Sequence, residues 1–137
     1  MDDCIFCRIA RGDVGAEKIL ETGRTLSFMD INPRAIGHIL VITKEHAVKL
    51  AELDDETVAE VFRATRDVVR ILQKALKPDG FTIGINDGKE AGQEIPHLHV
   101  NIIPRFSGDG GKAIHSVVNN PPGEDIRETA RKIRSMA

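Results

Sequence analysis

The chain has few cysteines, no long hydrophobic run and almost no net charge. Only two cysteines, Cys4 and Cys7, occur among 137 residues, which is too few for a disulfide framework. No apolar run approaches the length of a transmembrane helix, so we expect no membrane partner. Lysine and arginine number 19 against 21 aspartate and glutamate, and this net charge of −2 gives no electrostatic case for binding nucleic acid.

The N-terminal segment also lacks the features of a targeting signal. Residues Met1–Cys4 are acidic and include neither the basic nor the apolar region of a secretory signal peptide. We therefore expect a cytoplasmic protein with reduced thiols. The length predicts a single domain, residues 1–137, and no internal repeat or long linker divides it.

Hydrophobic patterning predicts strands and helices in an order typical of an α+β fold. A short helical segment at 4–11 precedes expected strands at 18–21, 25–29 and 38–43. A long helix at 54–76 follows, then strands at 81–86 and 97–104, and an amphipathic helix that begins near Glu124. The fold class we expect is α+β, with a five-stranded antiparallel sheet packed by the long helix and the C-terminal helix.

The helix at 54–76 has an unusually wide apolar stripe. Asp54, Asp55 and Glu56 place negative charge at its start, as the helix dipole favours. Its apolar side chains span an arc of roughly 120°, or roughly 180° with three further residues, whereas one buried contact typically takes about 100°. The helix is therefore expected to contact something besides its own sheet, either a partner subunit or a second internal element.

Residues 97–101 read His-Leu-His-Val-Asn and carry the strongest functional signal. Strict alternation predicts a β-strand with His97, His99 and Asn101 on one face. Imidazole titrates near neutral pH and can act as a base, a nucleophile or a metal ligand. A polar stripe opposite a hydrophobic one indicates a site on the open face of a sheet.

Together with two earlier segments, this strand resembles the histidine triad (HIT) family. The family signature is His-φ-His-φ-His-φ-φ, where φ is apolar, and residues 97–103 match it except at the third histidine, which is Asn101 here. Residues 30–46 are similar to the family's nucleotide-pocket segment, and residues 86–93 to its phosphate-side loop. The resemblance covers about residues 4–106 and leaves 107–137 as a C-terminal extension with a helix.

The resemblance implies a nucleotide hydrolase or transferase that works through a covalent nucleotidyl-histidine. His99 is then expected to attack the α-phosphorus of purine nucleoside phosphoramidates, phosphate esters or dinucleoside polyphosphates, without a catalytic metal. The expected partners are a purine nucleotide resembling AMP or GMP and, because the family is usually dimeric, a second copy of the chain. The nucleotide-binding residues are expected to be Asp30, Ile31, Asn86, Gly92, Gln93, Asn101, Phe6 and Phe28.

Several of these residues also have a purely structural interpretation. Asp30 precedes Asn-Pro, where aspartate commonly caps a loop. Phe6 and Phe28 could wall a base slot or belong to the core. His38 is interpreted here as structural, although it matches the family pattern.

Asn101 leaves a second function open. Asparagine has a donor and an acceptor but cannot carry a proton or a positive charge. The family's third histidine is thought to contact phosphate oxygens and the leaving group, so its loss weakens support for the transition state. The alternative is a nucleotide- or partner-binding module with low activity, and a third interpretation is a hydrolase in which His97 and His99 bind a catalytic ion.

The pair Cys4-Ile5-Phe6-Cys7 has the CxxC spacing. A redox motif would need a preceding strand and a βαβ context, which position 4 lacks. With His46 and His97 the two thiolates could complete a tetrahedral Cys2His2 zinc shell, an arrangement that many bacterial members of the family resemble. Such a closed shell would be structural and leave no position for water, and two free thiols with two polar histidines are the alternative.

Overall fold

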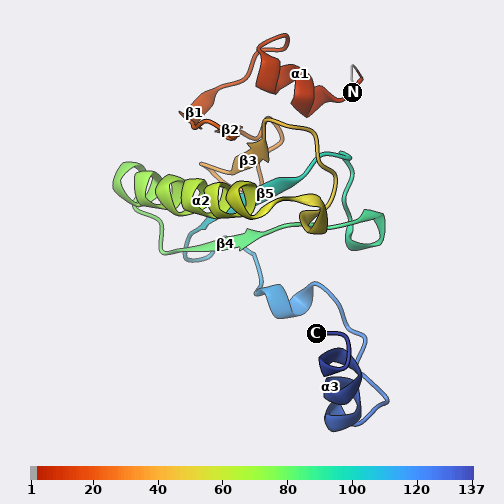
Figure 1. Cartoon of the computed structure of the whole chain (residues 1–137). Coiled ribbons are helices and arrows are strands. Elements are labelled where there is room, and N and C mark those ends of the chain that lie inside the picture. Colours follow the sequence, from red (N-terminus) through yellow and green to blue (C-terminus); the bar gives the residue numbers. More distant parts are fainter. Residues whose placement is uncertain (1–2) are drawn as a thin grey trace.

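An antiparallel sheet of five strands forms the centre of the computed structural model, which describes residues 3–137 (Figure 1). Met1 and Asp2, part of the acidic N-terminal segment, lie outside the described residues. The order across the sheet is β1-β2-β3-β5-β4, so β5 is paired on both sides and β1 and β4 are the edges. This confirms the predicted five-stranded α+β fold. The strands are β1 (Lys18–Glu21), β2 (Thr25–Met29), β3 (Ile39–Thr43), β4 (Gly80–Gly84) and β5 (His99–Arg105).

Three α-helices and three short 3-10 turns accompany the strands in the described residues. The helix α2 agrees with the prediction for 54–76, and Asp54 Oδ1 caps it by accepting the backbone N–H of Thr57 at 2.8 Å. None of the helices in residues 3–137 is long and apolar enough to cross a bilayer. The helices are α1 (Ile5–Arg11), α2 (Asp55–Ala75) and α3 (Ile126–Arg134), and the turns are η1 (Leu50–Glu52), η2 (Lys89–Ala91) and η3 (Ile114–Ser116).

The helices α1 and α2 pack on opposite faces of the sheet. On one face, α2 contributes Val61, Val68 and Leu72 to a core with Val41, Val100 and Ile102. On the other face, α1 contributes Phe6 and Ile9 to a core with Leu26, Phe28, Leu40 and Ile42. Because side chains alternate along β5, Val100 faces α2 while His99 and Asn101 face the α1 side. The polar stripe thus lies on the face that α2 leaves open.

The wide stripe of α2 is only partly buried in this chain. Its centre is buried, whereas Phe62 on one flank is 46% exposed and Ile71 on the other is 39% exposed. Among the described residues no second element covers these two side chains. The carboxylate of Glu60 reaches the β1–β2 turn, where Oε2 accepts the backbone N–H of Arg24. At about 100° per residue, Phe62 lies on the opposite flank, toward β5 and β4.

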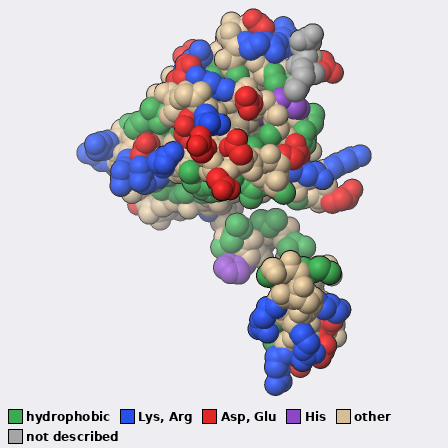
Figure 2. Space-filling model, viewed as in Figure 1, with side chains coloured by type: hydrophobic (Ala, Val, Ile, Leu, Met, Phe, Trp, Pro, Cys, Tyr) green, Lys and Arg blue, Asp and Glu red, His purple; other side chains and the backbone are tan. Residues whose placement is uncertain are grey.

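The C-terminal helix does not pack on the sheet as predicted. It forms near the expected position, but none of its residues is buried, and Figure 1 shows it apart from the sheet. In the same view, Figure 2 shows this end of the chain as a separate lobe. Of its nine residues, only Ile126, Ala130 and Ile133 are apolar, and it is α1 that packs on the face of the sheet opposite α2. The N-terminal helix therefore takes the packing role that the sequence had suggested for the C-terminal one.

The strand that carries the histidines is also shorter at its start than predicted. It begins at His99, because the backbone N–H of Leu98 donates to the carbonyl of Ala47 at 2.7 Å and not to the ladder. It ends at Arg105, one residue beyond Pro104. Consequently His97 precedes the strand and is free to turn under the N-terminus of α1.

Gly37 fixes the approach of the chain to β3. Its φ of +86° is a left-handed conformation that side-chain-bearing residues rarely adopt. A Cβ at this position would lie 2.5 Å from Leu76 Cδ1 and 3.2 Å from Leu72 Cδ2, both on the α2 side. A glycine here lets the loop at 30–38 pass close to the end of α2 and deliver His38 to the edge of the cavity described below.

Candidate active site

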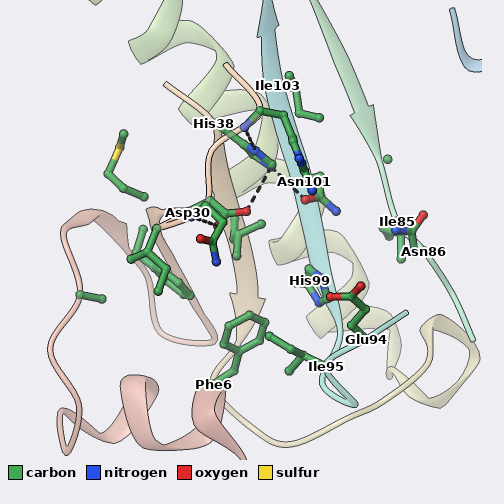
Figure 3. Close-up of a pocket in the computed structure, with 18 of the residues that line it drawn as sticks. Phe6, Asp30, His38, Ile85, Asn86, Glu94, Ile95, His99, Asn101 and Ile103 are labelled. Carbon is green, nitrogen blue, oxygen red and sulfur yellow. Dashed lines mark hydrogen bonds and ion pairs between the residues drawn. The ribbon is translucent and has the colours of Figure 1, made fainter. Parts of the chain in front are cut away.

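A cavity of about 730 Å³ opens on the α1 face of the sheet, between α1, the loop after β2 and the strands β4 and β5 (Figure 3). Apolar side chains from α1, β2 and β3 form one wall, and polar groups from β5 and the loops form the other. The predicted site residues that line it are Phe6, Phe28, Asp30, Ile31, Asn86, Gly92, His99 and Asn101. A cavity of this size, apolar with a few convergent polar groups, is typical of small-molecule sites.

His99 is held in one tautomer by its own chain. Its Nδ1 lies 2.8 Å from the carbonyl oxygen of His97, and because a carbonyl only accepts, Nδ1 carries the proton. The Nε2 lone pair then remains free, since this atom makes no hydrogen bond to the described residues. Figure 3 shows the ring beside Glu94 and Ile95 at the cavity. A neutral imidazole with a free lone pair is a competent nucleophile.

Asp30 and His38 lie at the two ends of the loop that follows β2. Asp30 Oδ1 accepts the backbone N–H of Asn32 at 2.9 Å, so the loop-capping interpretation of Asp30 is confirmed. Its Oδ2 lies 3.6 Å from His38 Nε2, and the carboxylate also lines the cavity. His38 is 3% exposed and its Nε2 lies 3.0 Å from Asn101 Oδ1. Two histidines thus line the cavity: His38, which directly precedes β3, and His99, which is the first residue of β5.

The loop at 86–93 brings two predicted residues to the cavity but not the third. Gly92 has a φ of +97°, and an added Cβ would lie 3.7 Å from Asn86 Nδ2, so the backbone runs close to that amide. Gln93 does not line the cavity. Its amide is used to close the loop, because Oε1 accepts the Gly88 N–H at 2.9 Å and Nε2 donates to the Val48 carbonyl at 2.9 Å.

Phe6 joins the cavity wall to the histidines. Its ring lies edge-on to Phe28 at 5.6 Å, to His97 at 5.8 Å and to His99 at 5.2 Å between centroids. Phe6 is 4% exposed, so the core and pocket-wall interpretations both hold for this side chain. The same holds for Phe28, which is buried and lines the cavity. Aromatic edge contacts of this kind restrict how the His99 ring can tilt.

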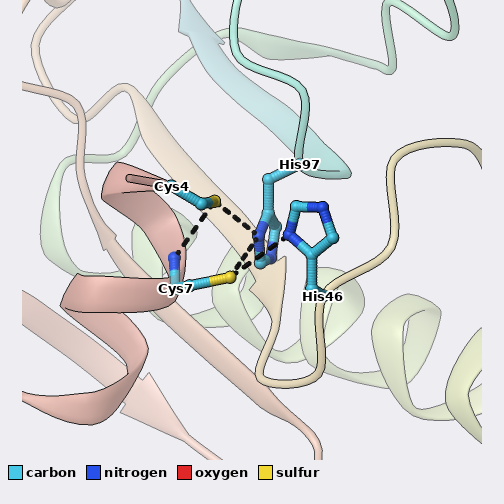
Figure 4. Close-up of side chains that lie close together, drawn as sticks. All are labelled: Cys4, Cys7, His46 and His97. Atoms are coloured by element: carbon cyan, nitrogen blue, oxygen red, sulfur yellow. Dashed lines mark hydrogen bonds between the residues drawn. The ribbon is translucent and has the colours of Figure 1, made fainter. Parts of the chain in front are cut away.

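Cys4, Cys7, His46 and His97 form a second cluster beneath the N-terminus of α1 (Figure 4). Their four potential ligand atoms lie within 4.8 Å of one another. The sulfur of Cys4 is 3.3 Å from His97 Nδ1, and the sulfur of Cys7 is 3.2 Å from His46 Nδ1. Donors around a tetrahedral zinc ion stand roughly 3.3–3.8 Å apart, given its usual bond lengths, so the cluster fits such an ion.

The protonation pattern of the cluster also suits a metal. His97 Nε2 lies 2.8 Å from the carbonyl oxygen of Thr43, so Nε2 carries the proton and Nδ1 presents its lone pair to the sulfurs. Burial lowers the pKa of His97, which keeps this ring neutral. Burial also raises the pKa of the Cys7 thiol, and the neighbouring Cys4 adds to this, so a cation would be needed to hold both thiolates.

The cluster excludes one of the sequence interpretations. His97 is fully buried and its ring faces the two sulfurs, away from the cavity. A catalytic ion shared by His97 and His99 would require both rings to turn toward one point in the cavity. His97 instead belongs to the cysteine–histidine cluster and His99 to the cavity. The interpretation in which these two histidines bind one catalytic ion is therefore wrong.

Some cavity residues were not singled out by the sequence as binding residues. His38 was interpreted as structural, and its contact with Asn101 joins residues that no short-range pattern connects. Ile114 and Val117 of the C-terminal extension also line the cavity although they are 60% and 74% exposed. Their apolar spacing around η3 is the only signal the sequence offers for them.

Taken together, the fold and the cavity define an α+β protein with a histidine, His99, at an apolar cavity of the size that small molecules occupy. The chain belongs to the HIT family, because the HIT domain model matches residues 11–108. It is 40% identical over 132 residues to the adenosine 5'-monophosphoramidase of Schizosaccharomyces pombe, covering 96% of each chain.

Two solved structures extend the comparison. A crystal structure of a HIT family member from Bacillus subtilis is 32% identical with a TM-score of 0.87, covering 98% of this chain and 97% of that one. A zinc-bound histidine triad family protein from Mycobacterium smegmatis is 36% identical with a TM-score of 0.75, covering 98% of this chain and 92% of that one. The family resemblance predicted from residues 4–106 is therefore confirmed.

Proposed function

We propose that this protein hydrolyses or transfers nucleotides at the α-phosphorus, with His99 as the nucleophile. The observation that carries the proposal is the Nδ1 contact of His99 with the His97 carbonyl, which leaves Nε2 unprotonated at the cavity. The relative from Schizosaccharomyces pombe, named as an adenosine 5'-monophosphoramidase, supports a purine nucleotide as the substrate. Phosphoramidates, phosphate esters and dinucleoside polyphosphates are the substrate classes we propose.

The reaction takes two displacements. In the first, the Nε2 lone pair of His99 forms a bond to phosphorus, and the bond to the leaving atom breaks with its electron pair on that atom. In the second, the oxygen of a water attacks phosphorus and the P–N bond breaks, returning the pair to the imidazole. The water's proton goes to solvent, and a nucleoside monophosphate leaves.

The cavity residues divide naturally between the parts of a nucleotide. Phe6 and Phe28 wall the apolar end, which suits a purine base, with Ile31 at its rim. Asp30, beside this wall, suits the ribose hydroxyls because a carboxylate accepts two hydrogen bonds. Asn86, Asn101 and the backbone of Gly92 lie at the polar end and suit phosphate oxygens. Gln93 would act indirectly, by closing the loop that carries Gly92.

Adduct trapping tests the proposal. The protein is incubated with adenosine 5'-phosphoramidate, quenched in neutral denaturant and digested. The mass of the peptide that contains His99 is then measured by mass spectrometry. We expect an adenylyl adduct on His99 and release of AMP, both abolished by His99→Ala. His115→Ala is the matched control, because this histidine is exposed in the C-terminal extension and does not line the cavity. Turnover that survives His99→Ala would contradict the proposal.

A binding module with little activity is the second candidate, and Asn101 is the observation that favours it. An amide at this position cannot supply positive charge to the phosphate. Tight binding of AMP without an adduct on His99, and with no gain when Asn101 is changed to histidine, would select this candidate over the enzyme.

We also propose that Cys4, Cys7, His46 and His97 hold a structural zinc ion. The donor set, the spacing and the lone pair on His97 Nδ1 support this, as does the zinc-bound relative from Mycobacterium smegmatis. When bound, the ion would tie α1 to the segment before β5. With four protein ligands it would leave no position for a reacting water.

Finally, we propose a homodimer formed through the edge strand β4. Ile83 on β4 is 40% exposed, and Phe62 on the adjacent flank of α2 is 46% exposed. An edge strand with uncovered apolar neighbours is prone to pair with another copy. The C-terminal extension, with its exposed Ile126 and Ile133, would then be available to contact the partner.

A further inference from the structure

Asn101 occupies the place of the family's third histidine, and His38 is its partner. His38 Nε2 lies 3.0 Å from Asn101 Oδ1, in a position where the His38 side chain is 4% exposed (Figure 3). His38 directly precedes β3, and Asn101 lies on the neighbouring strand β5, where Leu40 of β3 is opposite it in the sheet. The two residues are 63 positions apart in the sequence, so no short-range pattern predicts their contact. The family signature at residues 97–103 does not include this contact either.

A backbone hydrogen bond determines the tautomer of His38 and, through it, the orientation of the Asn101 amide. The N–H of Arg34 donates to His38 Nδ1 at 3.1 Å, so Nδ1 must carry a lone pair and Nε2 must carry the proton. A protonated Nε2 can only donate, and therefore the atom of Asn101 that faces it must be the amide oxygen. The amide NH2 group of Asn101 is then directed away from His38.

The space beside that NH2 group belongs to the cavity. Asn101 and His99 are two residues apart on β5 and share the α1 face, which places them roughly 6–7 Å apart along the strand. Opposite Asn101 on β4 is Gly84, where even an added Cβ would meet nothing within 4 Å. A phosphate attacked by His99 would thus have room to place an oxygen against the Asn101 amide.

We propose that His38 is a positioning residue, which turns the Asn101 amide so that the site offers phosphate a fixed donor but no transferable proton. This inference rests on the proposed function and deepens it. A histidine in place of Asn101 could hand a proton to the leaving atom as its bond to phosphorus breaks. The Asn101 amide can stabilise the phosphate oxygens only, so the leaving group must depart as it is or be protonated by solvent.

The chemical consequence is a preference among the proposed substrates. A phosphate or other weakly basic oxygen leaves as an anion with the electron pair of the broken P–O bond and needs no proton. An amine leaving from a phosphoramidate needs one, because the amide anion is far too basic to depart. The chain should therefore favour anhydrides such as dinucleoside polyphosphates over alkyl phosphoramidates. Glu94, which lies beside His99 in the cavity, is the acid placed to replace the missing donor.

A leaving-group series tests the specificity. Adenosine 5'-aryl phosphates, from nitrophenyl to unsubstituted phenyl, are compared by kcat/KM in the wild type, Asn101→His and Glu94→Gln. We expect a steep fall with leaving-group basicity in the wild type, a shallower one in Asn101→His, and a gain of about 100-fold for this variant on the phosphoramidate. A shallow wild-type slope that Glu94→Gln makes steep would overturn the inference, because Glu94 would then be the proton donor.

Variants of His38 test the positioning role. His38→Phe should lower kcat about 10-fold to 100-fold with a smaller change in KM, and His38→Gln, which retains a donor, should restore part of it. Asn101→Asp keeps an acceptor for His38 but removes the NH2 group, and should lose as much as His38→Phe. Because the side chains are similar in shape, its thermal unfolding should change little, which separates loss of the donor from misfolding.

A spectroscopic readout completes the test. The side-chain 1H–15N signals of Asn101 should be resolved and shift on binding AMP in the wild type, and should lose this shift in His38→Phe. Adduct formation on His99 with wild-type kcat in His38→Phe would overturn the positioning role alone. Absence of any adduct, in Asn101→His as well, would instead remove the proposed function.

Discussion

The ring of His99 donates from Nδ1 to the backbone carbonyl of His97 at 2.8 Å, while the ring of His97 faces the sulfurs of Cys4 and Cys7. Two histidines of one motif thus connect the cysteine–histidine cluster to the cavity through a single carbonyl group. Phe6, between the two cysteines in sequence, also contacts both rings. A change that disorders the cluster should therefore also change the position of the His99 ring and of the cavity wall at Phe6.

Removal of the metal should destabilise the fold and weaken nucleotide binding. A ligand present at a thousand times its dissociation constant stabilises by about 4 kcal/mol, which corresponds to a fall in Tm of roughly 15 °C on removal for a chain of this size. AMP affinity should fall about 10-fold as the Phe6 contacts loosen. Metal content, differential scanning calorimetry and AMP titration, before and after chelation, measure these effects.

The variants His46→Ala and His115→Ala provide the matched comparison. The first removes one of the four donors and should lose metal and thermal stability together, whereas the second removes an exposed histidine and should change neither. A wild-type protein that contains no zinc after growth in zinc-supplemented medium would contradict the structural-zinc proposal. So would a Tm that is insensitive to chelation.

Replacement of Phe6 by leucine should affect binding more than folding. Leucine retains much of the buried apolar area, so the stability loss should be about 1–2 kcal/mol. The edge contacts with the His99 and Phe28 rings are lost, and AMP affinity should fall about 3-fold to 10-fold. Isothermal titration checks this, with Phe62→Leu on α2 as the control that leaves affinity unchanged.

The variant Gly37→Ala should disturb the site from a distance. Its backbone φ of +86° and the close approach to Leu76 both disfavour a side chain, and the expected cost is about 2–4 kcal/mol. His38, the next residue, should move away from Asn101, so kcat should fall as well. Chemical denaturation and kinetics measure the two effects. Gly123→Ala, which meets nothing within 4 Å and has no positive φ, should stay within about 0.5 kcal/mol of the wild type.

How far the sequence predicts this molecule depends on the range of the interactions involved. The helix α2 was predictable within a residue at each end, because Asp54 caps it locally and apolar residues recur at helical spacing. The start of β5 was not, because the Leu98 N–H donates to the carbonyl of Ala47, which is 51 residues upstream. The packing of α3 was also mispredicted, since its amphipathic pattern does not say which surface it faces.

The site shows the same division. His99 and the Cys4–Cys7 pair could be predicted from short motifs, and His46 was added by the family resemblance. The hydrogen bond between His38 and Asn101 could not be predicted. It requires β3 and β5 to pair in register and the loop before β3 to turn at Gly37. Gln93 shows the opposite case, where a residue inside a binding motif turns its amide to the loop backbone.

Association through β4 should be sensitive to one flank of α2. Light scattering after size exclusion should give a mass of about twice 15.1 kDa for the wild type. Phe62→Asp places a charge beside β4 and should shift the protein toward the monomer. Ile71→Asp, at a side chain that is 39% exposed on the opposite flank, is the control and should leave the mass unchanged. A monomeric wild type at micromolar concentration, or a monomer produced equally by both variants, would contradict the proposed interface.

Acid should weaken the tie between α2 and the β1–β2 turn. Glu60 Oε2 accepts the Thr22 hydroxyl and the Arg24 N–H, both at 2.5 Å, and these bonds, the hydroxyl first, lower the pKa of Glu60. A carboxyl whose pKa is lowered on folding stabilises the protein above its unfolded pKa of about 4.3, and this stabilisation is lost as the pH falls through the folded value.

The variant Glu60→Gln keeps the shape and an accepting oxygen but removes the charge. Its urea midpoint should therefore lie below that of the wild type at pH 7, and the two midpoints should converge as the pH falls below about 4. Glu90→Gln, a change at an exposed glutamate in η2, should follow the wild type throughout. A constant difference between Glu60→Gln and the wild type from pH 7 to pH 3 would show that packing, and not the ionised carboxylate, makes this contact stabilising.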